Sequence, residues 1–243
     1  MKNKSLSYTL LSLNIAGYMG WLNREKLIIN YIEAIKPDFI FLQEVQYDSK
    51  ISNFDQAKIL NSNLREPYKY SNSPISRSYI GHDKTLYREG LACLSRHPII
   101  QSETHVLTKH PDDKHDRIIQ TVLIETLNQQ LEIINVHFSN NKHSIEQFRE
   151  VYDFASKYKR WPIIVGDFNI FNLSELRELY KDHYSASTDF KDYISFPSER
   201  LTLDYLLLPK KFRFEAIETK ESLSDHSAVI YSFSSNNSIA QYK

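Results

Sequence analysis

Isolated polar side chains follow apolar runs along this sequence. Asn14 ends the first such run and Glu44 ends the second. Further along, Asn135 and His137 lie two residues apart at the end of another run. Residues i and i+2 of a strand point to the same face of a sheet, so such a pair can reach one pocket. Polar groups at strand ends are therefore the first candidates for a shared site.

The second half of the chain repeats this pattern. Asp167 and Asn169 have the same two-residue spacing, and Asp204 interrupts an apolar segment. Asp225 and His226 come just before the final apolar run. Ligands of α/β sheets bind where strand ends converge. We therefore expect these residues to contribute to one site.

The residue types narrow the chemistry of this site. Oxygen ligands from Asp, Glu and Asn, without cysteine thiolates, suit Mg²⁺ or Mn²⁺ better than structural zinc. Histidines with carboxylate partners can transfer protons or place positive charge on a phosphoryl oxygen. Together these groups predict metal-assisted hydrolysis of a phosphate ester. Nucleophilic catalysis has less support, because no Gly-x-Ser-x-Gly motif occurs and Cys93 lies inside an apparent strand.

The composition excludes several other classes of protein. The 243 residues are 41% hydrophobic and 25% charged, which is typical of a folded soluble domain. Lys plus Arg and Asp plus Glu number 30 each, so no global positive field attracts a nucleic acid or an anionic membrane. No apolar run is long enough for a transmembrane segment. The single cysteine cannot form an internal disulfide, which favours a cytoplasmic location.

Alternating helices and strands must position the polar residues. Helical periodicity predicts one helix between Asn23, taken as its cap, and Pro37, and others over 48–66, 144–158 and 174–181. Ser144 and Gln147 have the spacing of a capping box. The polar, turn-rich segment 71–89 is predicted to be a long loop. Strands are predicted at 6–15, 38–42, 90–95, 99–107, 117–126, 131–137, 162–165, 203–208, 212–219 and 228–233.

These elements predict a single α/β domain over residues 1–243, with a core at about 6–233 and a polar C-terminal tail. Six motifs occur in order along it: Ser12-Leu13-Asn14-Ile15, Leu42-Gln43-Glu44-Val45, Asn135-Val136-His137, Gly166-Asp167-Phe168-Asn169, Leu203-Asp204-Tyr205 and Ser224-Asp225-His226. This ordered set resembles that of the endonuclease/exonuclease/phosphatase superfamily. The resemblance implies a four-layer α/β sandwich, in which two mixed β-sheets pack face to face with helices outside.

The resemblance also implies a metal site. Glu44 would hold the catalytic Mg²⁺ or Mn²⁺, with Asn14 and Asp225 beside it as ligands or as residues that orient the ligands. Taken singly, each of these residues could equally cap a turn or lie in solvent. The ordered set of motifs makes the functional interpretation the stronger one.

Four further residues have catalytic roles by the same resemblance. Asp167 would position or activate the attacking water, and Asn169 would steady the phosphate. His226 would be oriented by Asp204. These roles describe a phosphodiester hydrolase that uses water as its nucleophile.

The remaining site residues surround His137. By the resemblance, this histidine would protonate the leaving oxygen and pair with Glu89, from Tyr87-Arg88-Glu89-Gly90. Asn140, three residues after His137, is a candidate phosphate contact. Arg117 is a second one, although an arginine that opens a strand is more often a solvated surface residue.

The residue at position 137 also bears on the substrate. Members that resemble exonuclease III usually carry tyrosine there, whereas nucleases like deoxyribonuclease I, sphingomyelinases and inositol-polyphosphate 5-phosphatases carry histidine. The 5-phosphatase signature Trp-x-Gly-Asp-x-Asn is absent, because position 164 is Ile. DNA or RNA is the favoured substrate, since several basic residues fall along the middle loops and could form a local basic face. They are Arg77, Lys84, Arg88, Arg96 and Lys109.

Other interpretations stay open at this point. One is a phosphodiesterase of the sphingomyelinase type, which acts on a phospholipid or a small molecule. Another is a non-catalytic member that binds a phosphorylated partner. His105, His110 and His115 lie near several aspartates, but their spacing matches no zinc motif, which favours a solvated loop over a second metal site.

Overall fold

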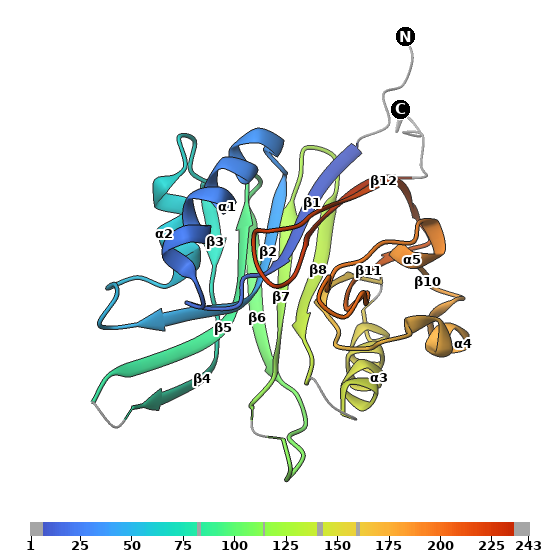
Figure 1. The fold of residues 1–243 in the computed structure, drawn as a ribbon. Coiled ribbons are helices and arrows are strands. Elements are labelled where there is room, and N and C mark those ends of the chain that lie inside the picture. Colours follow the sequence, from blue (N-terminus) through green and yellow to red (C-terminus); the bar gives the residue numbers. More distant parts are fainter. Residues whose placement is uncertain (1–6, 82–83, 114, 140–142, 159–160, 236–243) are drawn as a thin grey trace.

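Two β-sheets pack face to face, and helices cover their outer faces (Figure 1). The computed structural model describes residues 7–81, 84–113, 115–139, 143–158 and 161–235. The helices are α1 (Trp21–Ile35), α2 (Gln56–Asn63), α3 (Ser144–Ala155), the 3-10 turn η1 (Leu173–Leu176), α4 (Arg177–Tyr180) and α5 (Ser187–Phe190). No helix within these described ranges is both long and apolar enough to cross a membrane.

The first sheet has the strand order β12-β13-β1-β2-β5-β3, and β4 also pairs with β5. β1 and β2 are parallel, while the other neighbours are antiparallel. Its strands are β1 (Ser7–Asn14), β2 (Phe39–Asp48), β3 (Tyr70–Asn72), β4 (Ile75–Ile80), β5 (Leu86–Ser95), β12 (Phe212–Lys220) and β13 (Ala228–Ser235).

The second sheet has the order β10-β11-β9-β8-β7-β6, with β8 and β9 parallel and the others antiparallel. The prediction of two mixed sheets in a sandwich is therefore confirmed. The strands of this sheet are β6 (Ile99–Val106), β7 (Ile118–Glu125), β8 (Gln130–His137), β9 (Ile163–Asp167), β10 (Tyr184–Ala186) and β11 (Asp204–Pro209).

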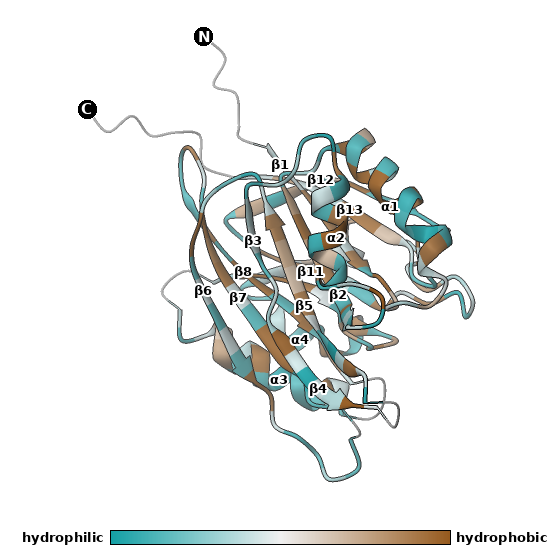
Figure 2. Cartoon of the chain, turned by 90° about the vertical axis from the view of Figure 1, so that its left-hand side faces the viewer, coloured by the Kyte–Doolittle hydropathy of each residue, from teal (hydrophilic) through white to brown (hydrophobic). Residues whose placement is uncertain are grey.

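Three apolar clusters hold the four layers together. Between the sheets, Phe39 and Phe41 of β2 join Ile133 of β8 and Val165 of β9 in one buried cluster. A second cluster joins the first sheet to α1 and α2, and a third joins the second sheet to α3. Figure 2 shows hydrophobic and hydrophilic residues on both α1 and α3, as expected for helices that lie on a sheet with one side in water.

Buried amides cross between the sheets at the end of the apolar core. Gln43 Nε2 donates to Asn135 Oδ1 at 2.8 Å, and Asn135 Nδ2 donates to Gln120 Oε1 at 3.0 Å. All three side chains are fully buried, so an unmade bond here would leave a costly polar group without a partner. These bonds fix the relative position of β2, β7 and β8 just before the polar strand ends begin.

Helix starts differ from the predicted ones. α1 begins at Trp21 behind Gly20, whose φ of 60° suits glycine, so Asn23 lies inside the helix and is not its cap. The predicted capping box at Ser144 is also wrong, because His143 is the N-cap of α3. Gln147 instead accepts a bond from the Ser139 N–H at 2.8 Å. The Gln147 side chain thus bonds to the backbone before α3 instead of closing a capping box with Ser144.

Two segments of the first sheet were assigned incorrectly from periodicity. Within the predicted loop 71–89, β4 and the first part of β5 form an antiparallel pair. The apolar residues of β4 lie at its two ends and are exposed, so the strand lacks the regular alternation of apolar and polar residues that identifies a core strand. The predicted helix 48–66 shortens to Gln56–Asn63 and begins behind Asp55, its N-cap. Asp48, the first residue of the predicted helix, is instead the last residue of β2.

Candidate active site

A cavity of about 470 Å³ opens where polar ends of strands from both sheets meet. Strand register brings its residues together, because His137 on β8 and Asp204 on β11 are both register partners of Asp167 on β9. On the first sheet, Asn14 pairs in register with Gln43 next to Glu44. The cavity is lined by Glu44, Gln46, Arg77, Glu89, His115, Arg117, His137, Asp167, Asn169, Phe171, Phe196, Glu199, Leu203, Asp225 and His226.

Asp167 lies at the centre of this arrangement. Its Oδ2 accepts a bond from Asn14 Nδ2 at 3.0 Å, and its Oδ1 accepts the backbone N–H of Asn169 at 3.0 Å. The carboxylate is almost fully buried. Burial is the main cause that raises the pKa of Asp167 to about 7, while the nearby His226 opposes the shift. A carboxylate with a pKa in this range can take up a proton near neutral pH.

His226 and Asp204 form a buried pair. The distance from His226 Nδ1 to Asp204 Oδ2 is 2.8 Å, and the other ring nitrogen, Nε2, lies 3.8 Å from Asp167 Oδ2. Burial by itself disfavours the charged ring, but the two carboxylates outweigh it and raise the pKa of His226 to about 10. His226 is therefore an imidazolium at neutral pH, and the expected partnership with Asp204 is present.

His137 lies on the other side of Asp167 in a different environment. Its Nδ1 is 2.9 Å from Nη1 of Arg117, and its Nε2 lies 3.6 Å from Asp167 Oδ2 and 3.7 Å from Glu44 Oε1. Burial and the Arg117 cation lower the pKa of His137 well below its usual value. Because arginine can only donate, Nδ1 must accept and the proton of the neutral ring is on Nε2. That proton faces the carboxylates and the cavity.

Asn14 joins the two sheets at the site. Its amide group donates to Glu44 Oε1 at 3.2 Å as well as to Asp167, and its Oδ1 accepts the Ala16 N–H at 3.0 Å. With every polar atom engaged, Asn14 is suited to orienting the two carboxylates. Burial raises the pKa of Glu44, and the hydrogen bond from Asn14 partly offsets this shift.

The backbone is strained at three positions around the cavity. Ala16, Glu44 and Asn169 have φ values of 50°, 54° and 49°, a region that non-glycine residues seldom occupy. At Glu44 this coincides with a register shift between Leu42 and Val45 in the pairing of β2 with β5. Such an irregularity re-aims a side chain. Here the residue at the irregularity is Glu44, which interrupts the strand pairing and lines the cavity.

Glu89 has partners other than the expected one. Its Oε2 accepts bonds from Arg77 Nη2 at 2.6 Å and from Gln46 Nε2 at 3.0 Å, whereas the predicted partner, His137, contacts Arg117. Motif order alone could not identify Arg77, because it enters from β4, the strand missed in the sequence. Arg77 also contacts His115 at Nδ1.

The other predicted site residues are distributed as follows. Asn169 Nδ2 donates to the Phe138 carbonyl at 2.9 Å, which orients its side chain at the cavity wall. The Asp225 carboxylate lines the same cavity and accepts the backbone N–H of His226 at 3.0 Å. Arg117 is buried in the site and is not a solvated surface residue. Asn140 lies outside the described residues.

The predicted basic face does not form as a single surface. Arg96 donates to the Pro37 carbonyl at 3.1 Å, next to the start of β2 and thus away from the site at the end of that strand. Arg88 lies over Tyr47 at 5.4 Å, and Lys109 pairs with Asp116 at 2.8 Å. Of the predicted basic residues, Arg77 does line the cavity, where it pairs with Glu89 at 2.6 Å. Arg117 is the second arginine in the cavity lining.

The donor set fits a hard divalent cation. Glu44 and Asp225 bring carboxylates to one cavity, and the charge of Asp225 contributes to the raised pKa of Glu44. A cation between crowded carboxylates would relieve this repulsion, and oxygen donors suit Mg²⁺ or Mn²⁺. A further group whose ligand atoms approach one another consists of Asp167, Asp204 and His226.

Comparison with known proteins agrees with this geometry. The sequence profile described as the Endonuclease/Exonuclease/phosphatase family matches residues 11–226, which span every described site residue. The chain belongs to this family. Because its members hydrolyse phosphoester bonds and depend on a metal, the chain is a metal-dependent phosphoester hydrolase. A search of curated protein sequences finds no match.

Solved structures share the fold of this family member at low sequence identity. An endonuclease/exonuclease/phosphatase from Beutenbergia cavernae is 18% identical, with a TM-score of 0.77 over 96% of this chain and 72% of that one. TDP2 from D. rerio, complexed with a single-strand DNA product, is 14% identical with a TM-score of 0.73, covering 94% and 99%. The human Nocturnin catalytic domain with bound sulfate is 17% identical with a TM-score of 0.67, covering 96% of each chain.

Proposed function

We propose that this family member is a Mg²⁺-dependent phosphodiesterase that cleaves nucleic acid. The observation that carries the proposal is the position of Asp167 between two histidines in opposite charge states. Its Oδ2 lies 3.6 Å from His137 Nε2 and 3.8 Å from His226 Nε2. A base flanked by a neutral donor and a cation can serve the attacking water and the phosphoryl oxygens together.

The metal would be held by the carboxylates of Glu44 and Asp225, with Asn14 orienting Glu44. When bound, Mg²⁺ would supply a Lewis acid that neutralises charge on the phosphoryl group. Mn²⁺ has the same ligand preference and could replace it.

The proton transfers are assigned from the pKa shifts. Asp167, with its pKa near 7, takes the proton of the attacking water. The His226 imidazolium, held by Asp204, stabilises negative charge on a phosphoryl oxygen of the transition state. Neutral His137 donates a hydrogen bond from its Nε2–H to the leaving oxygen, and that oxygen takes its proton from water. Asn169 contacts the phosphate from the same wall as Asp167.

Nucleic acid is favoured as the substrate for two reasons. Arg77 and Arg117 bring two guanidinium groups to the cavity lining, and these can hold a neighbouring phosphate of a polyanion. Phe171, two residues after Asn169, lines the same cavity and is 70% exposed, so a base can stack on it. The fold that TDP2 shares with this chain accommodates single-strand DNA in that protein.

A phospholipid phosphodiesterase of the sphingomyelinase type is the second candidate. Arg77 of β4 lines the cavity. On the same strand, Ile75, Tyr79 and Ile80 are 48%, 52% and 72% exposed. An apolar edge of this kind could insert into the surface of a bilayer.

The test is nicking of supercoiled plasmid in Mg²⁺ by the wild type and by His226→Ala. We expect activity in the wild type, loss with EDTA, and a decrease of about 10²- to 10⁴-fold in the variant. His183→Ala is the matched control, because His183 stacks on Trp161 outside the cavity.

Full activity of a folded His226→Ala variant, or activity that survives EDTA, would refute the assignment. Sphingomyelin vesicles and a small phosphodiester are assayed in parallel. Turnover of vesicles without plasmid nicking would select the lipid candidate. In that case Ile80→Ser should weaken vesicle hydrolysis and leave hydrolysis of the small phosphodiester unchanged.

A further inference from the structure

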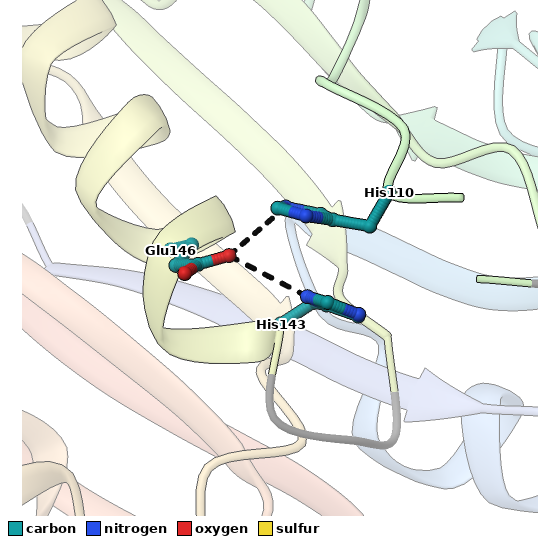
Figure 3. Close-up of side chains that lie close together, drawn as sticks. All are labelled: His110, His143 and Glu146. Atoms are coloured by element: carbon teal, nitrogen blue, oxygen red, sulfur yellow. Dashed lines mark hydrogen bonds and ion pairs between the residues drawn. The ribbon is translucent and has the colours of Figure 1, made fainter. Parts of the chain in front are cut away.

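A second group of metal-ligand side chains lies outside the cavity, at the start of α3. Figure 3 shows His110 and His143 with parallel rings, both directed at one carboxylate oxygen of Glu146. His110 Nε2 lies 3.0 Å from Glu146 Oε2, and His143 Nδ1 lies 3.4 Å from the same atom. The rings are 3.8 Å apart with an interplanar angle of 11°.

The spacing of these atoms matches ligands of a tetrahedral ion. Metal–nitrogen and metal–oxygen bonds of about 2.0–2.1 Å put neighbouring ligand atoms about 3.3 Å apart in a tetrahedron. The two measured separations lie on either side of this value. The three ligand atoms are also all within 4.8 Å of one another. One ion can contact all three atoms once the rings, which are stacked in this structure, tilt so that their nitrogen lone pairs converge.

His143 contacts a carboxylate through its second ring nitrogen, as metal-binding histidines usually do. Its Nε2 lies 2.6 Å from Asp112 Oδ1, on the side of the ring away from Glu146. Metal-binding histidines usually donate their second ring N–H to a carboxylate, which fixes the tautomer and makes the other nitrogen a better ligand. Asp112 thus leaves Nδ1 of His143 with its lone pair directed at the proposed ion.

The position of this group at the N-terminus of α3 makes nearby carboxylates necessary for binding a cation. The N-terminus of a helix disfavours a cation, and His143 is the N-cap of α3. Glu146 in the first turn and Asp112 bring negative charge that opposes this effect. Without an ion, the lone pair of His143 Nδ1 faces the Glu146 carboxylate oxygen 3.4 Å away. A divalent ion satisfies both nitrogens and the carboxylate at once.

We propose that His110, His143 and Glu146 form a binding site for a zinc-class transition-metal ion, with Asp112 positioning His143. Imidazole nitrogen with one carboxylate favours Zn²⁺ or Co²⁺ over Mg²⁺, so the site differs in metal preference from the all-oxygen centre at Glu44. The ion would tie the segment before Arg117 to the first turn of α3. His110 and Glu146 also line a surface groove, through which the ion can enter.

The test measures Co²⁺ and Zn²⁺ retained after gel filtration in excess Mg²⁺, by elemental analysis and by the visible absorption of Co²⁺. We expect about one ion per wild-type chain and almost none in His110→Ala or His143→Ala. Asp112→Asn keeps the ligands and should weaken Zn²⁺ binding about 10- to 100-fold. His105→Ala, whose ring packs on Phe154, is the matched control and should bind like the wild type.

Thermal unfolding gives a second measurement that does not depend on enzymatic activity. Zn²⁺ should raise the Tm of the wild type and of His105→Ala but not that of His110→Ala, because an ion stabilises only a chain that binds it when folded. Equal retention of metal in the wild type and both histidine variants would overturn the proposal. Loss of Zn²⁺ from Glu44→Gln with full retention by His110→Ala would also overturn it, since the ion would then belong to the cavity.

Discussion

The two buried histidines of the cavity have similar positions and opposite electrostatic surroundings. His137 is the last residue of β8 and His226 lies two residues before β13, and both approach the same oxygen of Asp167. His226 is paired with Asp204 and has its pKa raised to about 10. His137 contacts Arg117, and burial with that cation lowers its pKa. The neighbours therefore determine which ring carries a charge, and burial alone does not.

The largest effect should come from removing the carboxylate beside His226. Asp204→Asn keeps the shape of the side chain but removes the charge that holds the imidazolium. We expect kcat to fall about 10²- to 10⁴-fold, because the charged ring no longer stabilises the transition state. In metal-free protein, the pKa of His226 should fall toward its usual value, as measured by NMR titration.

Asp38→Asn is the control for this change. Asp38 lies 3.5 Å from His97, in a histidine–aspartate pair outside the cavity. Its substitution should leave kcat unchanged. An unchanged pKa of His226 in folded Asp204→Asn would show that the carboxylate is not the cause of the shift.

A smaller effect is expected when the cation beside His137 is removed. Arg117→Gln leaves a hydrogen-bonding side chain without charge, so the pKa of His137 should rise while burial still holds it below the usual value. Loss of a charged hydrogen bond to substrate should reduce kcat/KM about 10- to 100-fold. Arg96→Gln is the matched control, because its guanidinium packs on Tyr68 away from the site, 4.9 Å from the ring centroid. A His137 pKa that does not move would contradict this interpretation.

The smallest effect is expected for a carboxylate whose pKa is shifted mainly by burial and less by neighbouring charges. Glu132 on β8 is half-buried, and burial raises its pKa to about 7, with partial compensation by Lys211. A raised carboxyl pKa means that the folded state disfavours the ionised form. The penalty is complete above pH 7 and disappears below the unfolded-state pKa, near pH 4.5.

Glu132→Gln should therefore raise the Tm by about 1–3 °C at pH 8 and leave it unchanged at pH 4. Differential scanning fluorimetry at both pH values measures this. Glu125→Gln, at the exposed end of β7, should change the Tm at neither pH. An equal gain for Glu132→Gln at pH 4 would indicate a packing effect instead of a charge effect.

Much of the site was predictable because it depends on strand ends. Apolar runs identify strands, and register then brings His137, Asp167 and Asp204 to adjacent positions. The same apolar runs predicted one α/β domain, whereas the two-sheet sandwich was predicted from the resemblance to the family. Boundaries were less accurate where strands extend past the apolar core, as β2 does to Asp48.

Residues that enter from exposed elements were harder to predict. Arg77 lies on β4, an exposed strand without the regular apolar alternation of the core strands. His115 lines the cavity, and His110 contacts His143 and Glu146 from a segment distant in sequence. The spacing of the histidines within one segment of the sequence could not reveal partners that come from another segment. The Arg117–His137 contact, likewise, depends on side-chain geometry that motif order does not encode.

The strained backbone at Glu44 and Ala16 has an evolutionary consequence. A non-glycine residue with positive φ costs about 1–2 kcal/mol, and glycine would remove that cost. A lineage under selection for heat tolerance alone would therefore tend to lose the carboxylate at position 44 while keeping the sandwich intact. The glutamate at position 44 thus lowers the stability of the backbone while its carboxylate lines the cavity.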